Sequence, residues 1–74
     1  MTFKACLRQV GRNIQGARKK AGYTQEEMQD LGYNYRYYQK IEGGKVNPTL
    51  KTLWDLAKSL NTTVSKLVRG LNKK

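Results

Sequence analysis

Side chains able to bind an anionic partner crowd one short segment, NYRYYQKIE, which runs from Asn34 to Glu42. Its arginine presents a planar fork of N–H donors that matches the O6 and N7 acceptors of guanine or the oxygens of a phosphate. If the segment is a helix, Tyr38 and Ile41 share its inward face. The side chains that then project outward are those of Tyr35, Arg36, Gln39 and Lys40.

No comparable set of residues points to catalysis. The chain has no histidine and a single cysteine, Cys6, so a zinc site made of cysteine and histidine is excluded. No pair of carboxylates is spaced for acid–base chemistry, and no phosphate-cradling glycine loop precedes a suitable helix. We therefore predict that the protein is not an enzyme and uses no metal, cofactor or small-molecule ligand.

The charge balance indicates what the outward residues bind. Fifteen Lys and Arg residues face five Asp and Glu residues, which gives a net charge of +10. Such an excess on 74 residues implies a polyanionic partner, nucleic acid first and an anionic membrane surface second; a merely basic soluble surface is the alternative. No apolar stretch fits a membrane span or a secretion signal. We expect no membrane partner, and a cytoplasmic, nucleoid-associated protein.

The elements that must position these residues are five short helices in one domain, residues 1–74. The first is predicted from about Phe3 to Lys20, and Gly22 ends it. Its glycine at position 11 would let another helix approach closely. The residues predicted on its inward face are Phe3, Cys6, Leu7, Val10, Ile14, Ala17 and Ala21, spaced by three and four.

The second and third helices carry start and stop signals of their own. Thr24 and Glu27 form a capping box, Met28 and Leu31 point inward, and Gly32 ends the second helix. Asn34 is a good N-cap for the third helix, which ends at Gly43-Gly44. A short helix, a turn of about three residues and a second capped helix, over about residues 24–42, match a helix-turn-helix.

Two further helices complete an all-α domain. Thr49 caps the fourth, and a short fifth follows Thr63, with a frayed basic tail at about residues 71–74. Trp54 is placed at the core boundary or in a dimer contact. The residues predicted to be inward are Leu50, Leu53, Leu56, Ala57 and Leu60 on the fourth helix and Val64, Leu67 and Val68 on the fifth.

Three strings together resemble a known family: GYTQEEM at residues 22–28, GYN at 32–34 and IEGGKVNPTL at 41–50. They are similar to the Cro/CI-type (XRE family) repressor domains of bacteria and phages, and the similarity extends from about Leu7 to Val68. The resemblance implies a five-helix, lambda-repressor-like DNA-binding domain. It also implies a sequence-specific transcriptional regulator that binds double-stranded DNA at a palindromic operator as a homodimer.

The same resemblance assigns roles to residues. The positions matching base-contacting residues are Tyr35, Arg36 and Lys40. Those matching phosphate-contacting residues are Gln25, Asn34, Gly44, Lys45 and Asn47, and Gln39 is expected to face phosphate or solvent. The family often pairs an arginine of the first helix with a glutamate at the end of the third, here Arg18 and Glu42.

One departure and one rival interpretation accompany this resemblance. The second helix is one residue shorter than is usual in the family, so Leu31 stands where a small alanine packs between the two helices. The rival function is an antitoxin-like or protein-interaction module built on the same fold. Membrane or RNA binding by charge alone is disfavoured, because capped helices separated by glycines are not needed for it.

Overall fold

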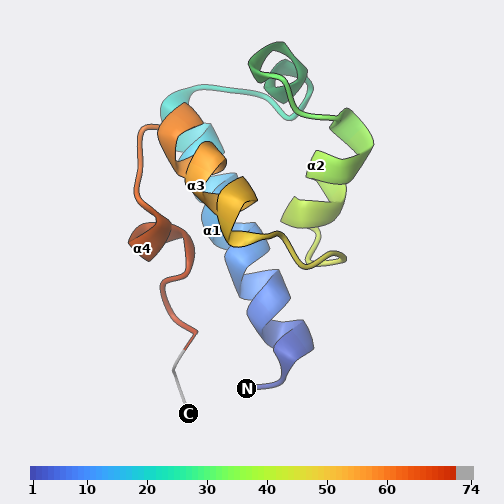
Figure 1. Ribbon diagram of the computed structural model, residues 1–74, viewed down its shortest axis with the longest axis vertical. Helices are drawn as coiled ribbons and strands as arrows, with labels where there is room; N and C mark the ends of the chain where they lie inside the picture. The colour runs from blue at the N-terminus through green and yellow to red at the C-terminus, as the bar shows by residue number, and fades with distance from the viewer. Residues whose placement is uncertain (72–74) are drawn as a thin grey trace.

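The helical elements follow one another around a long first helix. The computed structural model describes residues 1–71 (Figure 1). The elements are α1 (Phe3–Ala21), the 3₁₀ helix η1 (Glu26–Leu31), α2 (Tyr35–Glu42), α3 (Leu50–Ser59) and α4 (Val64–Leu67). The described residues include no strand, so the prediction of an all-α, five-helix fold is confirmed. The predicted basic tail lies mostly outside the described residues.

Side-chain caps fix where the α-helices begin. Asn34 Oδ1 accepts a hydrogen bond from the Tyr37 N–H (2.9 Å), and Thr49 Oγ1 accepts one from the Thr52 N–H (3.1 Å). The hydroxyl of Thr63 caps α4 in the same way. Each cap pairs an N–H that has no partner within the first turn, so these starts are encoded locally.

The second helix differs from the prediction in type and in the direction of one side chain. The Thr24–Glu27 capping box is present, with hydrogen bonds of 3.1 and 2.8 Å, but the six residues Glu26–Leu31 form a 3₁₀ helix. Gly32 turns the chain with φ 96°, which leaves too little length for two α-turns. Leu31, expected to point inward, ends η1 at the edge of the molecule with 37% of its surface exposed. Met28 alone of η1 is buried.

The core lies where α1 meets α2, α3 and α4. Figure 1 shows α1 in the middle, with α2 on one side of it and α4 on the other. The expectations for Phe3, Leu50 and Ala21 are wrong, because these residues lie at helix ends beyond the packed region; Leu50 is 71% exposed. The buried apolar residues are Val10, Ile14, Met28, Tyr38, Ile41, Leu53, Leu56, Ala57, Leu60 and Leu67.

Glycine lets α1 and the end of α2 touch through their backbones. A Cβ at Gly11 would lie 2.7 Å from the Ile41 carbonyl oxygen and closer still to that of Glu42. No larger residue fits without a shift of backbone, so the predicted close approach at Gly11 is confirmed. Gly44 (φ 70°) is buried in the same way against the backbone of Arg8.

A buried ion pair spans the same contact. Arg18 Nε lies 2.6 Å from Glu42 Oε2, and the two side chains are only 8% and 3% exposed. Arg18 also donates to the Tyr23 carbonyl oxygen (2.8 Å), and Gln25 donates to Glu42 Oε1 (2.8 Å). The pair expected from the family resemblance thus lies in contact and joins α1, the turn after it and the end of α2.

This environment shifts the ionisation of its members. Burial by itself would raise the pKa of Glu42, but the hydrogen bonds from Arg18 and Gln25 and the positive charge of Arg18 together lower it. The hydrogen bond to Glu42 raises the pKa of Arg18 further above its ordinary value. Both groups are therefore charged at neutral pH and depend on each other.

Glu42→Ala should destabilise the domain by about 3–5 kcal/mol, because Arg18 would stay buried without its anion. For a domain of this size, such a loss lowers the Tm by at least about 10 °C, measurable by circular dichroism. The control is Asp55→Ala, which removes the exposed Lys51–Asp55 pair (2.8 Å) and should cost less than about 1 kcal/mol. Equal Tm values for the two variants would contradict a buried pair.

The pH dependence of stability tests the same pair. The folded pKa of Glu42 lies below its unfolded value, so its contribution is complete above the unfolded pKa of about 4.3 and is lost as pH falls through the folded pKa. Urea unfolding from about pH 6 down to about pH 2 should show a steeper loss of stability for the native chain than for Glu42→Gln. Parallel curves would mean that Glu42 titrates alike in both states.

Candidate nucleic-acid interface

The outer face of α2 presents the predicted recognition residues to solvent. Arg36 and Lys40 are exposed and lie one turn apart, whereas Tyr38 and Ile41 on the opposite face are buried. Because the Asn34 cap starts the helix at Tyr35, Arg36 belongs to the first turn. In a helix-turn-helix this turn of the second helix enters the major groove.

Hydrogen bonds restrain the polar side chains next to Arg36. Gln39 Nε2 donates to the Tyr35 hydroxyl (3.1 Å) and lies 3.4 Å from Gln25 Oε1, while Gln25 donates to Glu42. These contacts link the start of η1 to the outer face of α2 and to the buried ion pair. Tyr35, Gln39 and Gln25 are therefore held in place before any ligand arrives, which lowers the entropy lost on binding.

The residues predicted to contact phosphate differ in their exposure to solvent. Lys45 and Asn47 are exposed in the loop after α2, and Asn34 is exposed at the opposite end of that helix. The Gly44 N–H, by contrast, donates to the Ile41 carbonyl oxygen (3.1 Å) in a buried turn. Gly44 is thus occupied by packing and offers no free donor for a phosphate.

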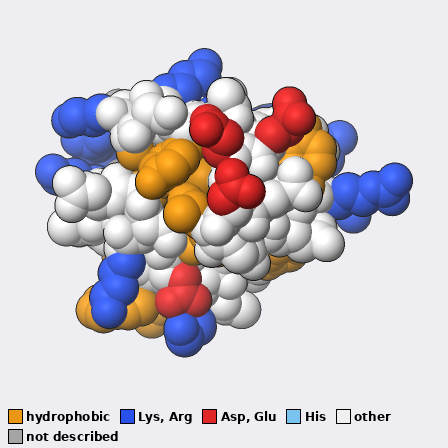
Figure 2. Space-filling model, turned by 90° about the horizontal axis from the view of Figure 1, so that it is seen from above, with side chains coloured by type: hydrophobic (Ala, Val, Ile, Leu, Met, Phe, Trp, Pro, Cys, Tyr) orange, Lys and Arg blue, Asp and Glu red, His pale blue; other side chains and the backbone are white. Residues whose placement is uncertain are grey.

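The surface is not uniformly basic. Figure 2 looks down on the end that carries η1 and shows acidic side chains gathered there, with lysine and arginine side chains projecting around the rim. The exposed acids of η1 are Glu26, Glu27 and Asp30. The potential is therefore more negative over these acids than over the basic flank of α2 and its following loop, and a polyanion favours that flank.

Sequence reasoning missed two features of this site. The Tyr35–Gln39 hydrogen bond joins residues four apart on a helix, so its spacing was available as a signal. The hydrogen bond from Gln25 to Glu42 joins residues 17 apart, and no local pattern in the sequence indicates it. Gln25 therefore has an inward contact in addition to any contact with a ligand.

Residues 1–71 contain no cluster of three His, Cys, Asp or Glu side chains able to hold a metal ion. Among the same residues, no helix has both the length and the apolar character needed to cross a membrane.

Comparison with known proteins identifies the arrangement. Residues 14–67 match the helix-turn-helix family model. An uncharacterized HTH-type transcriptional regulator, y4dJ of Sinorhizobium fredii (strain NBRC 101917 / NGR234), is 38% identical over 60 residues, which cover 80% of this chain and 78% of the relative. The SPbeta prophage-derived uncharacterized HTH-type transcriptional regulator YonR of Bacillus subtilis (strain 168) is 38% identical over 61 residues, 81% of this chain and 56% of that protein. The chain therefore belongs to the helix-turn-helix family, of the Cro/CI (XRE) type that its motifs resemble, and η1 and α2 are the two helices of the motif.

Proposed function

We propose that the protein is a sequence-specific transcriptional regulator that binds double-stranded DNA with α2 in the major groove. The observation that carries this proposal is the outer face of α2. Arg36 and Lys40 are exposed on a helix whose start is capped and whose end is anchored by the Arg18–Glu42 pair. The two relatives, both named as HTH-type transcriptional regulators, support the same function.

In this proposal three residues of α2 face the base edges. Arg36, in the first turn of α2, donates two hydrogen bonds to a guanine. Lys40 reaches a base or phosphate one turn further along. Tyr35 places its ring against a thymine methyl group or its hydroxyl on a phosphate, and its hydrogen bond to Gln39 restricts it to that region. Specificity then comes from a preordered surface.

The surrounding polar residues fix the register of the protein on the duplex. Lys45 and Asn47 contact phosphates from the loop after α2, and Asn34 does so from its start, with its amide nitrogen since its oxygen caps the helix. Gln25 and Gln39, which lie side by side, contact a phosphate between these points. Such contacts position the protein without selecting sequence.

We further propose that two copies bind a palindromic operator. Dimers of helix-turn-helix proteins place their two recognition helices one DNA turn apart, roughly 34 Å. One copy of this chain is 37 Å in its longest dimension and carries a single α2, so a second copy is needed to occupy the second half-site. The exposed apolar residues Leu50 and Trp54 on α3 are candidates for the contact between copies. The protein would act in the cytoplasm, at the nucleoid.

Affinity for duplex DNA should depend strongly on salt. If about six phosphates are neutralised per complex, log K falls with log salt concentration at a slope near −5. Selection from random duplex DNA supplies the operator. Fluorescence anisotropy at KCl concentrations from about 50 to about 300 mM then measures the slope. No duplex binding even at low salt would favour the protein-interaction module instead.

Arg36→Ala and Lys45→Ala should change DNA binding in different ways. Arg36→Ala should lose about 1–3 kcal/mol of discrimination at one symmetric pair of operator positions. Lys45→Ala should weaken all sequences alike and reduce the magnitude of the salt slope by about one. Affinities for a panel of operator variants separate the two effects. Equal weakening on every sequence by Arg36→Ala would make Arg36 a phosphate contact.

A further inference from the structure

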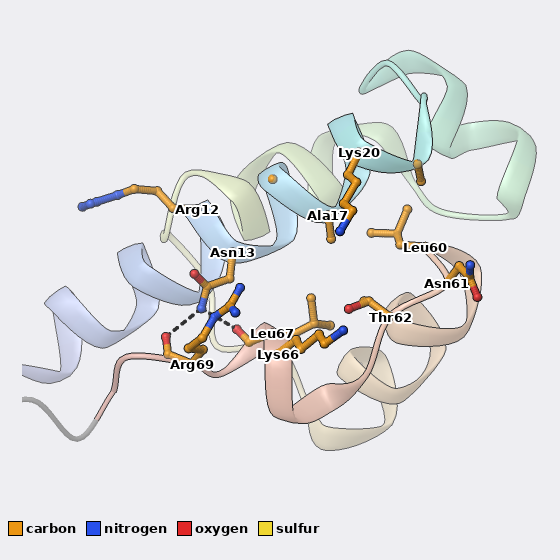
Figure 3. Close-up of a pocket in the computed structure, with 12 residues that line it drawn as sticks. Arg12, Asn13, Ala17, Lys20, Leu60, Asn61, Thr62, Lys66, Leu67 and Arg69 are labelled. Carbon is orange, nitrogen blue, oxygen red and sulfur yellow. Dashed lines mark hydrogen bonds between the residues drawn. The ribbon is translucent and has the colours of Figure 1, made fainter.

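A second basic surface lies on the far side of α1 from α2. A hollow of about 460 Å³ opens between α1 and the segment from the end of α3 through α4 (Figure 3). At 100° per residue, the α1 positions 13, 16 and 20 that line it point away from Gly11 and Arg18, which face α2. This basic groove is therefore separate from the proposed DNA-contacting face.

The groove has a fixed shape because one asparagine ties its two walls together. Asn13 Nδ2 donates to the carbonyl oxygens of Leu67 (3.0 Å) and Arg69 (2.9 Å), and Gln9 donates to Asn13 Oδ1 (2.9 Å). These bonds satisfy carbonyls at the end of the short α4 and hold that end against α1. The hydrogen bonds of Asn13 therefore fix the distance between α1 and the end of α4 at one end of the groove.

The charges around the groove all have one sign. Lys20 comes from α1, and Lys66 and Arg69 come from the opposite wall, while Arg12 lies at the rim with its guanidinium extending away from the gap in Figure 3; among the described residues, no acidic residue lines the groove. Figure 3 shows Lys20 and Lys66 extending into the gap from the two walls. A hollow lined by these three cations, with a fourth at its rim, concentrates positive potential, which an anionic ligand relieves.

The floor of the groove distinguishes between anionic partners. The accessible apolar carbon of the groove comes from Ala17 and from the methylene stems of Lys20 and Lys66, since Leu60 and Leu67 beneath them are only 3% and 1% exposed. A phosphate backbone gains nothing from such a floor, whereas an aliphatic side chain buries surface against it.

We propose that the basic groove docks an acidic peptide segment of a partner protein, in which carboxylates alternate with aliphatic side chains. In an extended segment successive side chains point to opposite sides, so the aliphatic ones enter the floor while the carboxylates meet Lys20, Lys66 and Arg69. Because this face lies opposite α2, the peptide binds without displacing DNA. Through the basic groove the protein binds a second protein.

The test uses the full chain and a fluorescein-labelled hexapeptide of alternating glutamate and leucine. Fluorescence anisotropy should show saturable binding. The double variant Lys20→Glu/Lys66→Glu should weaken it about tenfold or more. Its matched control is Lys19→Glu/Lys58→Glu, which removes exposed lysines from the last turns of α1 and α3 outside the groove and should change binding less than about threefold.

A variant that leaves all charges in place tests the cavity itself. A Cβ at Gly16, which lines the groove, meets nothing within 4 Å, so Gly16→Leu should fold normally by circular dichroism. Its side chain fills the groove and should abolish peptide binding while operator affinity stays unchanged. A peptide with serine in place of leucine should bind the native chain about tenfold more weakly, because the floor is then unused.

Three results would overturn the proposal. The first is an equal loss of peptide binding in the groove and control double variants, which would mean that net charge alone attracts the peptide. The second is undiminished binding by Gly16→Leu. The third is absence of peptide binding together with a loss of duplex affinity confined to the groove variants, which would make the groove a nucleic-acid surface. None of these depends on whether α2 contacts bases.

Discussion

The structure depends on one buried ion pair. Arg18 on α1 has its charge balanced by Glu42 at the end of α2, and Gln25, at the start of η1, also donates a hydrogen bond to Glu42. The pair is 24 residues apart in sequence, and Gly11 makes it possible by letting the two helix backbones touch. Buried charges are stable only when every partner is present, so the pair fixes three segments at once.

That constraint organises the surface as well as the core. With its C-terminal end anchored and its N-terminal end capped by Asn34, α2 turns Tyr38 and Ile41 inward and Arg36 and Lys40 outward. The opposite side of α1 is held by Asn13, which defines the basic groove. One helix thus supports two cationic surfaces, while the exposed acids gather on η1 at the end shown in Figure 2.

Local signals in the sequence were enough to predict most of the elements. Asn34, Thr49 and Thr63 begin helices wherever they occur at the start of an apolar repeat, because their side chains pair N–H groups in the next turn. The apolar spacing likewise predicted Val10, Ile14, Leu56 and Leu67 as core. The resemblance of the three sequence motifs to the family predicted the rest of the fold and the candidate site residues, including the pairing of Arg18 with Glu42.

Only the tertiary structure decided how these elements meet. Periodicity placed Leu50 and Leu31 inward, yet Leu50 is 71% exposed and Leu31 37%, because burial depends on the position of other helices. The same holds for Gly44, whose N–H is consumed by a buried turn, and for Gln25, which reaches Glu42. The basic groove joins residues more than 50 positions apart. Sequence spacing records the periodicity of one helix, whereas contacts between helices arise only when the chain packs.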